Sequence, residues 1–185
     1  MINYIGYSVA LHRIFLDKAA KLSDISNAVN QAFSDYKETV RKIYIHYGSD
    51  TFKPELIHGP HNNPFRNKPQ NAFWASPEDS DHGWKAWCEG EDFHTDRLDK
   101  SFRFKLKDGA KIFYVDSMEK ERFLPRLKTD CGYINIKSYD FDFLKHQGYD
   151  AVEVSLTDCW QLYDGMYGWD CDSIAILNPD IVEVI

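Results

Sequence analysis

Short strand-like segments separated by turns dominate the sequence after residue 42. Before them, apolar residues recur at steps of three and four from Leu22 to Val40, a spacing typical of one face of a helix. Many of the strand-like segments are joined by turns of hairpin length, which favours antiparallel pairing. We therefore predict an α+β fold with a largely antiparallel core. The expected strands are residues 43–47, 72–76, 102–106, 111–115, 150–155, 173–177 and 181–184.

A single domain is expected over residues 1–185, because no repeat, low-complexity tract or linker divides the chain. Residues 1–42 are predicted to form a strand and an amphipathic helix that packs on the core. No apolar run reaches the length of a membrane span, and the first 15 residues lack the features of a signal peptide. The 4 cysteines show no CxxC spacing, so we expect free thiols in a reducing cytoplasm.

Turn and capping signals predict several local structures. The segment 76–79 (Ser-Pro-Glu-Asp) is typical of a helix start with Ser76 as the N-cap, and this helix should run to about Phe93. Residues 102–106 and 111–115 flank a Lys-Asp-Gly-Ala turn and are predicted to form a hairpin. Ser117 and Ser138 are expected to cap two short helices. Four prolines between residues 48 and 71 preclude regular structure there, and such long loops are usually functional.

The charge balance limits the partners. With 22 Lys and Arg against 29 Asp and Glu, the net charge is −7, which argues against binding polyanions by charge alone. Bases gather in residues 100–128, where a nucleic acid or a phosphorylated partner could bind, although an ordinary solvated surface explains them more simply. His58 and His61 lack nearby cysteines or carboxylates, so we expect no metal.

Two short motifs contain candidate binding residues. The segment 46–49 (His-Tyr-Gly-Ser) ends a predicted strand, and Gly48 lets a ligand approach a backbone N–H and C=O, a pair that suits a carboxamide. A turn beside a partly buried histidine is the alternative. Phe73 and Trp74 can wall a pocket and stack on a flat heterocycle, or they can belong to the core. Ser76 can contact a ligand or act only as the N-cap.

These motifs, taken in order, resemble the ADP-ribosyltransferase fold over residues 43–185. Residues 44–49 are similar to the H-G-[ST] strand of that family, and residues 72–77 to its second motif, in which an aromatic residue and a serine share a strand. The resemblance implies split antiparallel β-sheets around an NAD cleft, with flanking helices. The resemblance also includes Trp84 and Trp87, which we expect to pack on one helix face, and the segments 106–111, 148–151 and 173–179.

The resemblance implies an enzyme of a toxin-like or phage-conflict type that uses NAD as its substrate. It would cleave the nicotinamide–ribose bond and transfer ADP-ribose to a protein or nucleic-acid acceptor, with no metal and no membrane partner. By similarity, His46 would bind a ribose hydroxyl and the Gly48 backbone would hold the carboxamide. Other residues of the two motifs would line the ring and the floor of the cleft: Tyr47, Ser49, Phe73, Trp74 and Ser76.

The catalytic carboxylate is where the sequence departs from the family, which usually has a glutamate at the start of the closing strand. Counting back from residues 178–179 (Asn-Pro), that position is Ser173, directly preceded by Asp172. Asp172 is one candidate for the carboxylate. Glu153, which projects from the small-residue face of a predicted strand, is the other, although a solvated strand face would also explain it. Asp170 is a third choice.

Three alternatives remain open at this point. A relative that binds NAD or ADP-ribose without chemistry is one, and an NAD glycohydrolase, in which water replaces the acceptor, is another. An RNA 2′-phosphotransferase shares the same fold, but it needs several basic residues around the phosphate. Near the expected cleft the sequence offers only Arg66 and Lys68.

Overall fold

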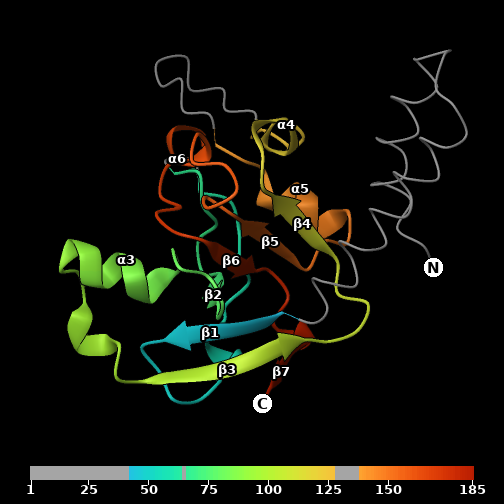
Figure 1. The fold of residues 1–185 in the computed structure, drawn as a ribbon. Coiled ribbons are helices and arrows are strands. Elements are labelled where there is room, and N and C mark those ends of the chain that lie inside the picture. Colours follow the sequence, from blue (N-terminus) through green and yellow to red (C-terminus); the bar gives the residue numbers. More distant parts are fainter. Residues whose placement is uncertain (1–41, 64–65, 128–137) are drawn as a thin grey trace, which may run out of the picture. The chain divides into compact units, whose positions relative to one another are not determined.

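A computed structural model describes residues 42–63, 66–127 and 138–185. Lys42–Ile185 clusters as one unit. The strand and helix expected before residue 42 lie outside the described residues. The strands are β1 (Ile43–Tyr47), β2 (Phe73–Pro77), β3 (Ser101–Leu106), β4 (Ile112–Val115), β5 (Ala151–Val154), β6 (Ser173–Ile176) and β7 (Val182–Val184) (Figure 1). The α-helices are α3 (Trp84–Glu91), α4 (Met118–Glu121), α5 (Phe141–His146) and α6 (Leu162–Gly165).

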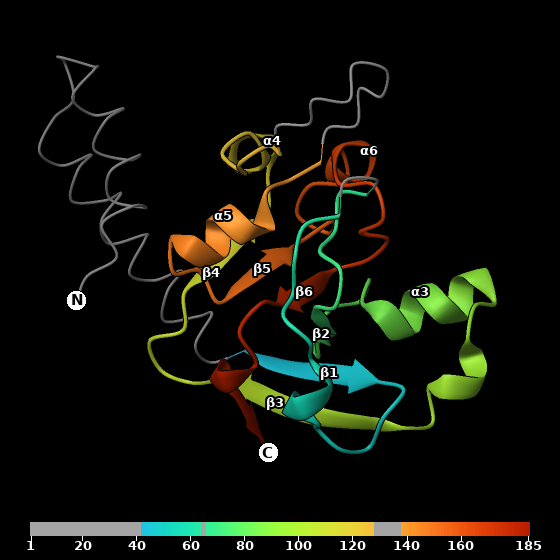
Figure 2. The same cartoon turned by 180° about the vertical axis from the view of Figure 1, so that it is seen from behind.

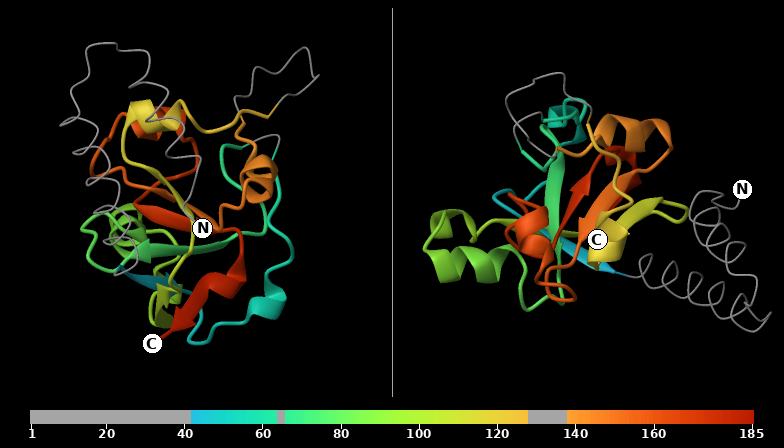
Figure 3. Two further views of the ribbon diagram at one scale, coloured as in Figure 1. Left: turned by 90° about the vertical axis from the view of Figure 1, so that its right-hand side faces the viewer. Right: turned by 90° about the horizontal axis from the view of Figure 1, so that it is seen from above.

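The seven strands form one sheet in the order β4-β5-β6-β2-β1-β3-β7. Every neighbouring pair is antiparallel except β4 and β5, which are parallel. The structure therefore confirms the α+β class and the largely antiparallel core. Figures 2 and 3 show the sheet from further directions, and in Figure 2 β1 and β3 run side by side.

The sheet is weakest in its middle, between β1 and β2. Their ladder contains only the pairs Tyr44–Pro77 and Ile45–Ser76, whereas the ladder between β1 and β3 extends over the whole of β1. Toward the end of β1 the strands β1 and β2 therefore separate. The sheet consists of two halves joined at this short ladder: β1, β3 and β7 on one side, and β2, β6, β5 and β4 on the other.

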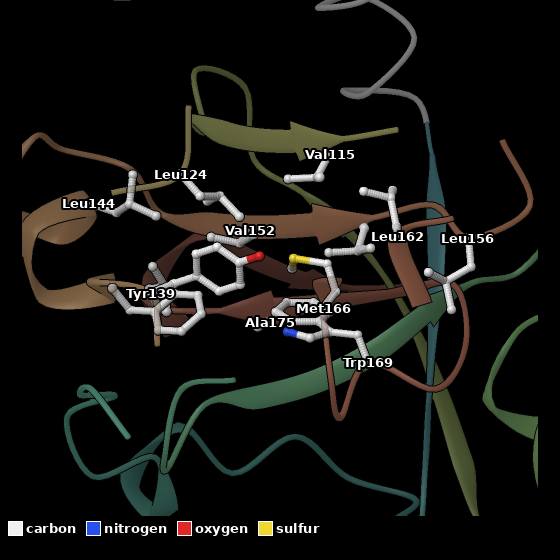
Figure 4. Close-up of a cluster of buried hydrophobic side chains, with 13 residues drawn as sticks. Val115, Leu124, Tyr139, Leu144, Val152, Leu156, Leu162, Met166, Trp169 and Ala175 are labelled. Atoms are coloured by element: carbon white, nitrogen blue, oxygen red, sulfur yellow. The ribbon is translucent and has the colours of Figure 1, made fainter. Parts of the chain in front are cut away.

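Two apolar cores pack against the sheet. Figure 4 shows the first core, where Val152 of β5 and Ala175 of β6 face Leu144 of α5 and Leu162 of α6. The second core lies between the two halves, because it combines Tyr44 and Phe104 with residues of β2, β5 and β6. Both faces of β5 and β6 are consequently buried, which explains why these strands are almost continuously apolar in the sequence.

The hairpin predicted from residues 102–115 does not form, although both of its strands do. β3 pairs with β1 and β7, and β4 lies at the opposite edge beside β5. The two ends of the connecting turn are held by distant segments. Lys107 N–H donates to Ile181 C=O at 2.8 Å, while Lys111 N–H donates to the Asp150 carboxylate at 2.9 Å. The turn therefore directs the chain from one half of the sheet to the other.

The helix predicted to start after Ser76 also begins elsewhere. Pro77 stays in β2 because it pairs with Tyr44, and Glu78 N–H extends this pairing by donating to Ile43 C=O at 2.9 Å. Helix α3 starts only at Trp84. Ser76 Oγ nevertheless accepts the Trp84 N–H at 2.8 Å. Ser76 therefore satisfies a donor at the start of α3, although it lies eight residues earlier in the chain and is not the local N-cap.

The two other predicted caps have different outcomes. Ser117 Oγ accepts the Lys120 N–H at 3.3 Å, which confirms it as the N-cap of α4. The N-cap of α5 is Asp140, whose carboxylate accepts the Phe143 N–H at 2.9 Å, and the prediction of Ser138 for this role was wrong.

Candidate functional site

A cavity of about 450 Å³ opens where β1 and β2 separate. Its volume lies in the range of small-molecule sites. Its walls come from β1, β2 and α3, from Arg66 and Lys68 of the long proline-containing loop, and from Asp170 and Ser173 at the start of β6. We call it the β1–β2 cavity. A second cavity of about 570 Å³ adjoins it, since His46, Tyr47 and Trp84 line both.

His46 is held in one orientation at the boundary of the two cavities. Its Nδ1 lies 2.7 Å from the Trp74 C=O, and because a carbonyl only accepts, Nδ1 must carry the proton. The rings of Phe73 and Phe102 pack against it with centroid distances of 4.7 and 5.2 Å. Burial lowers the pKa of His46 below its usual 6.5, so the ring is neutral at pH 7. Nε2 is then left as a hydrogen-bond acceptor.

The backbone after His46 offers a donor and an acceptor, but at Tyr47 instead of Gly48. Gly48 N–H donates at 2.8 Å to the C=O of Lys100, which directly precedes β3, so the N–H expected to hold a carboxamide is already used. Backbone groups alternate along a strand, which turns the N–H and C=O of Tyr47 to the opposite edge. There the β1–β2 ladder has ended, and the Trp74 C=O accepts the His46 ring.

Of the other residues in the first motif, Ser49 lies away from both cavities. Its Oγ accepts the Thr51 N–H at 3.2 Å and donates to the Thr51 C=O at 2.8 Å, which closes a tight turn. Gly48 has a φ of +98°, a conformation that side chains with a Cβ rarely adopt, and this explains the glycine in that turn.

Aromatic rings make up much of the cavity wall. Trp74 lines the cavity, whereas Phe73 faces the second core and stacks on Phe102 with a centroid distance of 5.9 Å. Trp84 and Trp87, which we expected only to pack, also line the cavity, and they stack on each other at 5.1 Å. Their spacing of three residues was the sequence signal, but it does not distinguish packing from a binding face.

Glu153 does not reach either cavity. Its side chain is 1% exposed and points into the second core, where it accepts hydrogen bonds from Tyr44 Oη at 2.7 Å and Lys42 Nζ at 3.0 Å. Burial raises the pKa of Glu153, and the ammonium group of Lys42 opposes that change. The alternative of a solvated strand face was therefore wrong, and Glu153 acts as a buried partner that joins β5 to β1.

Glu153→Gln is expected to lower the free energy of unfolding by about 2 kcal/mol. Removing one charge from a buried pair usually costs more, but Lys42 is partly exposed and retains some hydration. Urea denaturation measures the change. Glu183→Gln, which removes an exposed ion pair with Lys105, is the matched control and should change the value by less than about 0.5 kcal/mol. Equal effects of the two variants would contradict this role of Glu153.

Asp172 is also occupied by structural bonds and lines neither cavity. Its carboxylate accepts the N–H groups of Leu156 and Thr157 at 2.6 and 3.0 Å. It also accepts the hydroxyl groups of Thr157 at 2.6 Å and Ser80 at 2.7 Å. Asp172 thereby joins the segments after β2 and β5 to the start of β6. Among the three carboxylates considered from the sequence, only Asp170 lines the β1–β2 cavity.

The cavity combines rings with charges of both signs. Arg66 and Lys68 are its cations, and Lys68 Nζ lies 5.9 Å above the ring of Trp74. Such walls suit a ligand with a flat ring and a nearby anionic group. Within the described part of the chain, no three His, Cys, Asp or Glu side chains are grouped to hold a metal. Cys88, Cys159 and Cys171 are free thiols.

Comparison with protein-family models, with curated proteins and with solved structures found no match. Within the described ranges, no helix is long and apolar enough to cross a membrane. The functional argument therefore depends on the geometry of the cavity and on the motifs in the sequence.

Proposed function

We propose that this protein binds NAD in the β1–β2 cavity, cleaves the bond between nicotinamide and ribose, and transfers ADP-ribose to a protein or nucleic-acid acceptor. One observation carries the proposal. His46, the backbone of Tyr47 and the ring of Trp74 come from two sequence motifs, and they meet at a single cavity where β1 and β2 separate. The separation also supports the split-sheet ADP-ribosyltransferase fold that the motifs resemble.

The proposed binding mode gives each part of NAD a partner. The nicotinamide ring stacks on a tryptophan, and its carboxamide bonds to the N–H and C=O of Tyr47. His46 Nε2 accepts a hydrogen bond from a ribose hydroxyl. The diphosphate lies toward Arg66 and Lys68, whose positive charges favour an anion. The adjoining cavity leaves room for the remainder of the dinucleotide or for the acceptor.

The chemical step needs little more than positioning and charge stabilisation. The bond between ribose C1′ and the nicotinamide nitrogen breaks, and its electron pair neutralises the pyridinium ring. The ribose becomes an oxocarbenium-like cation, to which a nucleophilic oxygen or nitrogen of the acceptor adds and then loses its proton. An enzyme accelerates this step by holding the leaving ring and by stabilising the cation more strongly than the ground state.

A second candidate is a protein that binds NAD or ADP-ribose without cleaving it. This alternative is favoured by the serine at position 173, where the resemblance would have a glutamate, and by the distance of Glu153 and Asp172 from the cavity lining. The two candidates share the ligand and differ in chemistry. Release of nicotinamide distinguishes them.

Binding is tested by titration calorimetry of the wild-type protein with NAD, ADP-ribose and nicotinamide. The proposal predicts one site per chain and competition of both fragments with NAD. A protein that binds none of the three at millimolar concentration is neither a transferase nor a binding module of this kind.

NAD binding is expected to be constant from about pH 6.5 to 8 and to weaken at lower pH. Burial lowers the pKa of His46, so the neutral ring persists until the pH falls below the usual value of 6.5. Protonation of Nε2 then removes the acceptor for the ribose hydroxyl. The same titration makes the folded state lose stability as the pH falls through the lowered pKa. Calorimetric titrations with NAD across this pH range measure the affinity. A loss of affinity between pH 6.5 and 8 would contradict the role of His46 as the acceptor for the ribose hydroxyl.

A further inference from the structure

Asp170 lies in a segment whose flanking residues are fixed. On one side, Trp169 is 1% exposed, its Nε1–H donates to the Asn67 C=O at 2.6 Å, and its ring packs edge-on against Trp74 at 4.7 Å. On the other side, Asp172 N–H donates to the His82 C=O at 2.9 Å. The side chain of Asp172 holds the four donors described above.

This arrangement fixes the backbone of Asp170 from both directions. Its side chain is half-buried and lines the β1–β2 cavity together with His46 and Tyr47. Asp170 is the only Asp or Glu among the described residues that line this cavity. A carboxylate held between two anchored neighbours needs little rearrangement when charge develops next to it, and such preorganised groups give large catalytic effects.

We propose that Asp170 is the catalytic carboxylate of this site, with Asp172 as the positioning residue that holds its segment. The assignment rests on the proposed function. As the C1′–nitrogen bond breaks, the charge of Asp170 stabilises the oxocarbenium-like ribose. When the acceptor's O–H or N–H group then forms its bond to C1′, its proton passes to Asp170 and from there to water. The carboxylate is thereby regenerated, and no further reagent is needed.

The test compares Asp170→Asn, Asp170→Glu and Asp172→Asn with the wild-type protein. Nicotinamide release gives kcat, calorimetry gives the Kd for NAD, and thermal unfolding gives Tm. We expect Asp170→Asn to lower kcat by about 10²- to 10³-fold, with the Kd changed by less than about 3-fold and Tm nearly unchanged. Asp170→Glu restores a carboxylate and should regain part of the rate. Asp164→Asn, an exposed carboxylate on α6 outside both cavities, is the matched control.

Each outcome decides the assignment. A loss of kcat in Asp170→Asn, with partial recovery in Asp170→Glu and a lower Tm in Asp172→Asn, supports it. A wild-type protein that releases nicotinamide while Asp170→Asn retains the full rate overturns the assignment and leaves the proposed function standing. If Asp172→Asn instead lowers kcat at an unchanged Tm, Asp172 is the catalytic carboxylate. A wild-type protein that binds NAD but releases no nicotinamide overturns both the transferase and this role of Asp170.

Discussion

His46→Ala is expected to lower nicotinamide release from NAD by at least about 100-fold, the size of effect typical for loss of a group that binds the transition state. The variant removes the Nε2 acceptor that the proposal assigns to the ribose. It also removes the hydrogen bond from Nδ1 to the Trp74 C=O, which links β1 to β2 beside the cavity. Liquid chromatography of nicotinamide after incubation with NAD measures the rate.

Because His46 packs between Phe73 and Phe102, the alanine variant also leaves a gap in the protein. His46→Asn separates the two effects. An asparagine amide N–H can still donate to the Trp74 C=O, but the side chain lacks an acceptor at the position of Nε2. It should lose the same activity with a smaller loss of stability. His58→Ala, an exposed histidine outside both cavities, is the matched control, and an active His46→Asn variant would show that the site is misassigned.

Asp172→Ala is expected to lower the free energy of unfolding by about 3–5 kcal/mol. The carboxylate accepts two backbone N–H groups and two hydroxyl groups in a buried place. Truncation leaves the buried N–H of Leu156 without its partner, which costs about 1–3 kcal/mol, and it removes a charge-assisted hydrogen bond from the part-buried N–H of Thr157, which is worth about 1.5–3 kcal/mol. The hydroxyl groups can rotate toward other acceptors, which limits the total. Urea denaturation followed by tryptophan fluorescence measures the loss.

Asp164→Ala, an exposed carboxylate on α6, serves as the reference and should change stability by less than about 0.5 kcal/mol. If Asp172→Ala unfolds at the same urea concentration as this reference, Asp172 is not a structural anchor. The carboxylate of Asp172 would then be available for catalysis, and the roles assigned to Asp170 and Asp172 would have to be exchanged.

The strands were predictable from the sequence because their apolar runs are short and bounded by turn residues. Among the described residues, all seven expected strands lie within one residue of their predicted bounds at each end. Their pairing was less predictable. The turn before Lys111 has the residues of a hairpin, but its ends bond to Ile181 and Asp150, which are distant in the chain. Local turn chemistry contains no information about such partners.

Half of the candidate site was also predictable. His46 and Trp74 line the cavity as expected, because strand ends beside long loops are common places for binding residues. Gly48 and Glu153 do not act as expected, since the Gly48 N–H pairs with β3 and Glu153 points into a core that forms only when the two halves of the sheet meet. The residue pattern of one strand does not show which of the strand's two faces the other half of the sheet will cover.

The most direct test of the proposed function is nicotinamide release by the wild-type protein. The protein is incubated at pH 7.5 with NAD labelled on the nicotinamide ring, with and without a cell lysate, and free nicotinamide is separated from NAD. The account predicts release that depends on the protein and rises when the lysate supplies an acceptor. No release above the rate of NAD alone, under either condition, would contradict it.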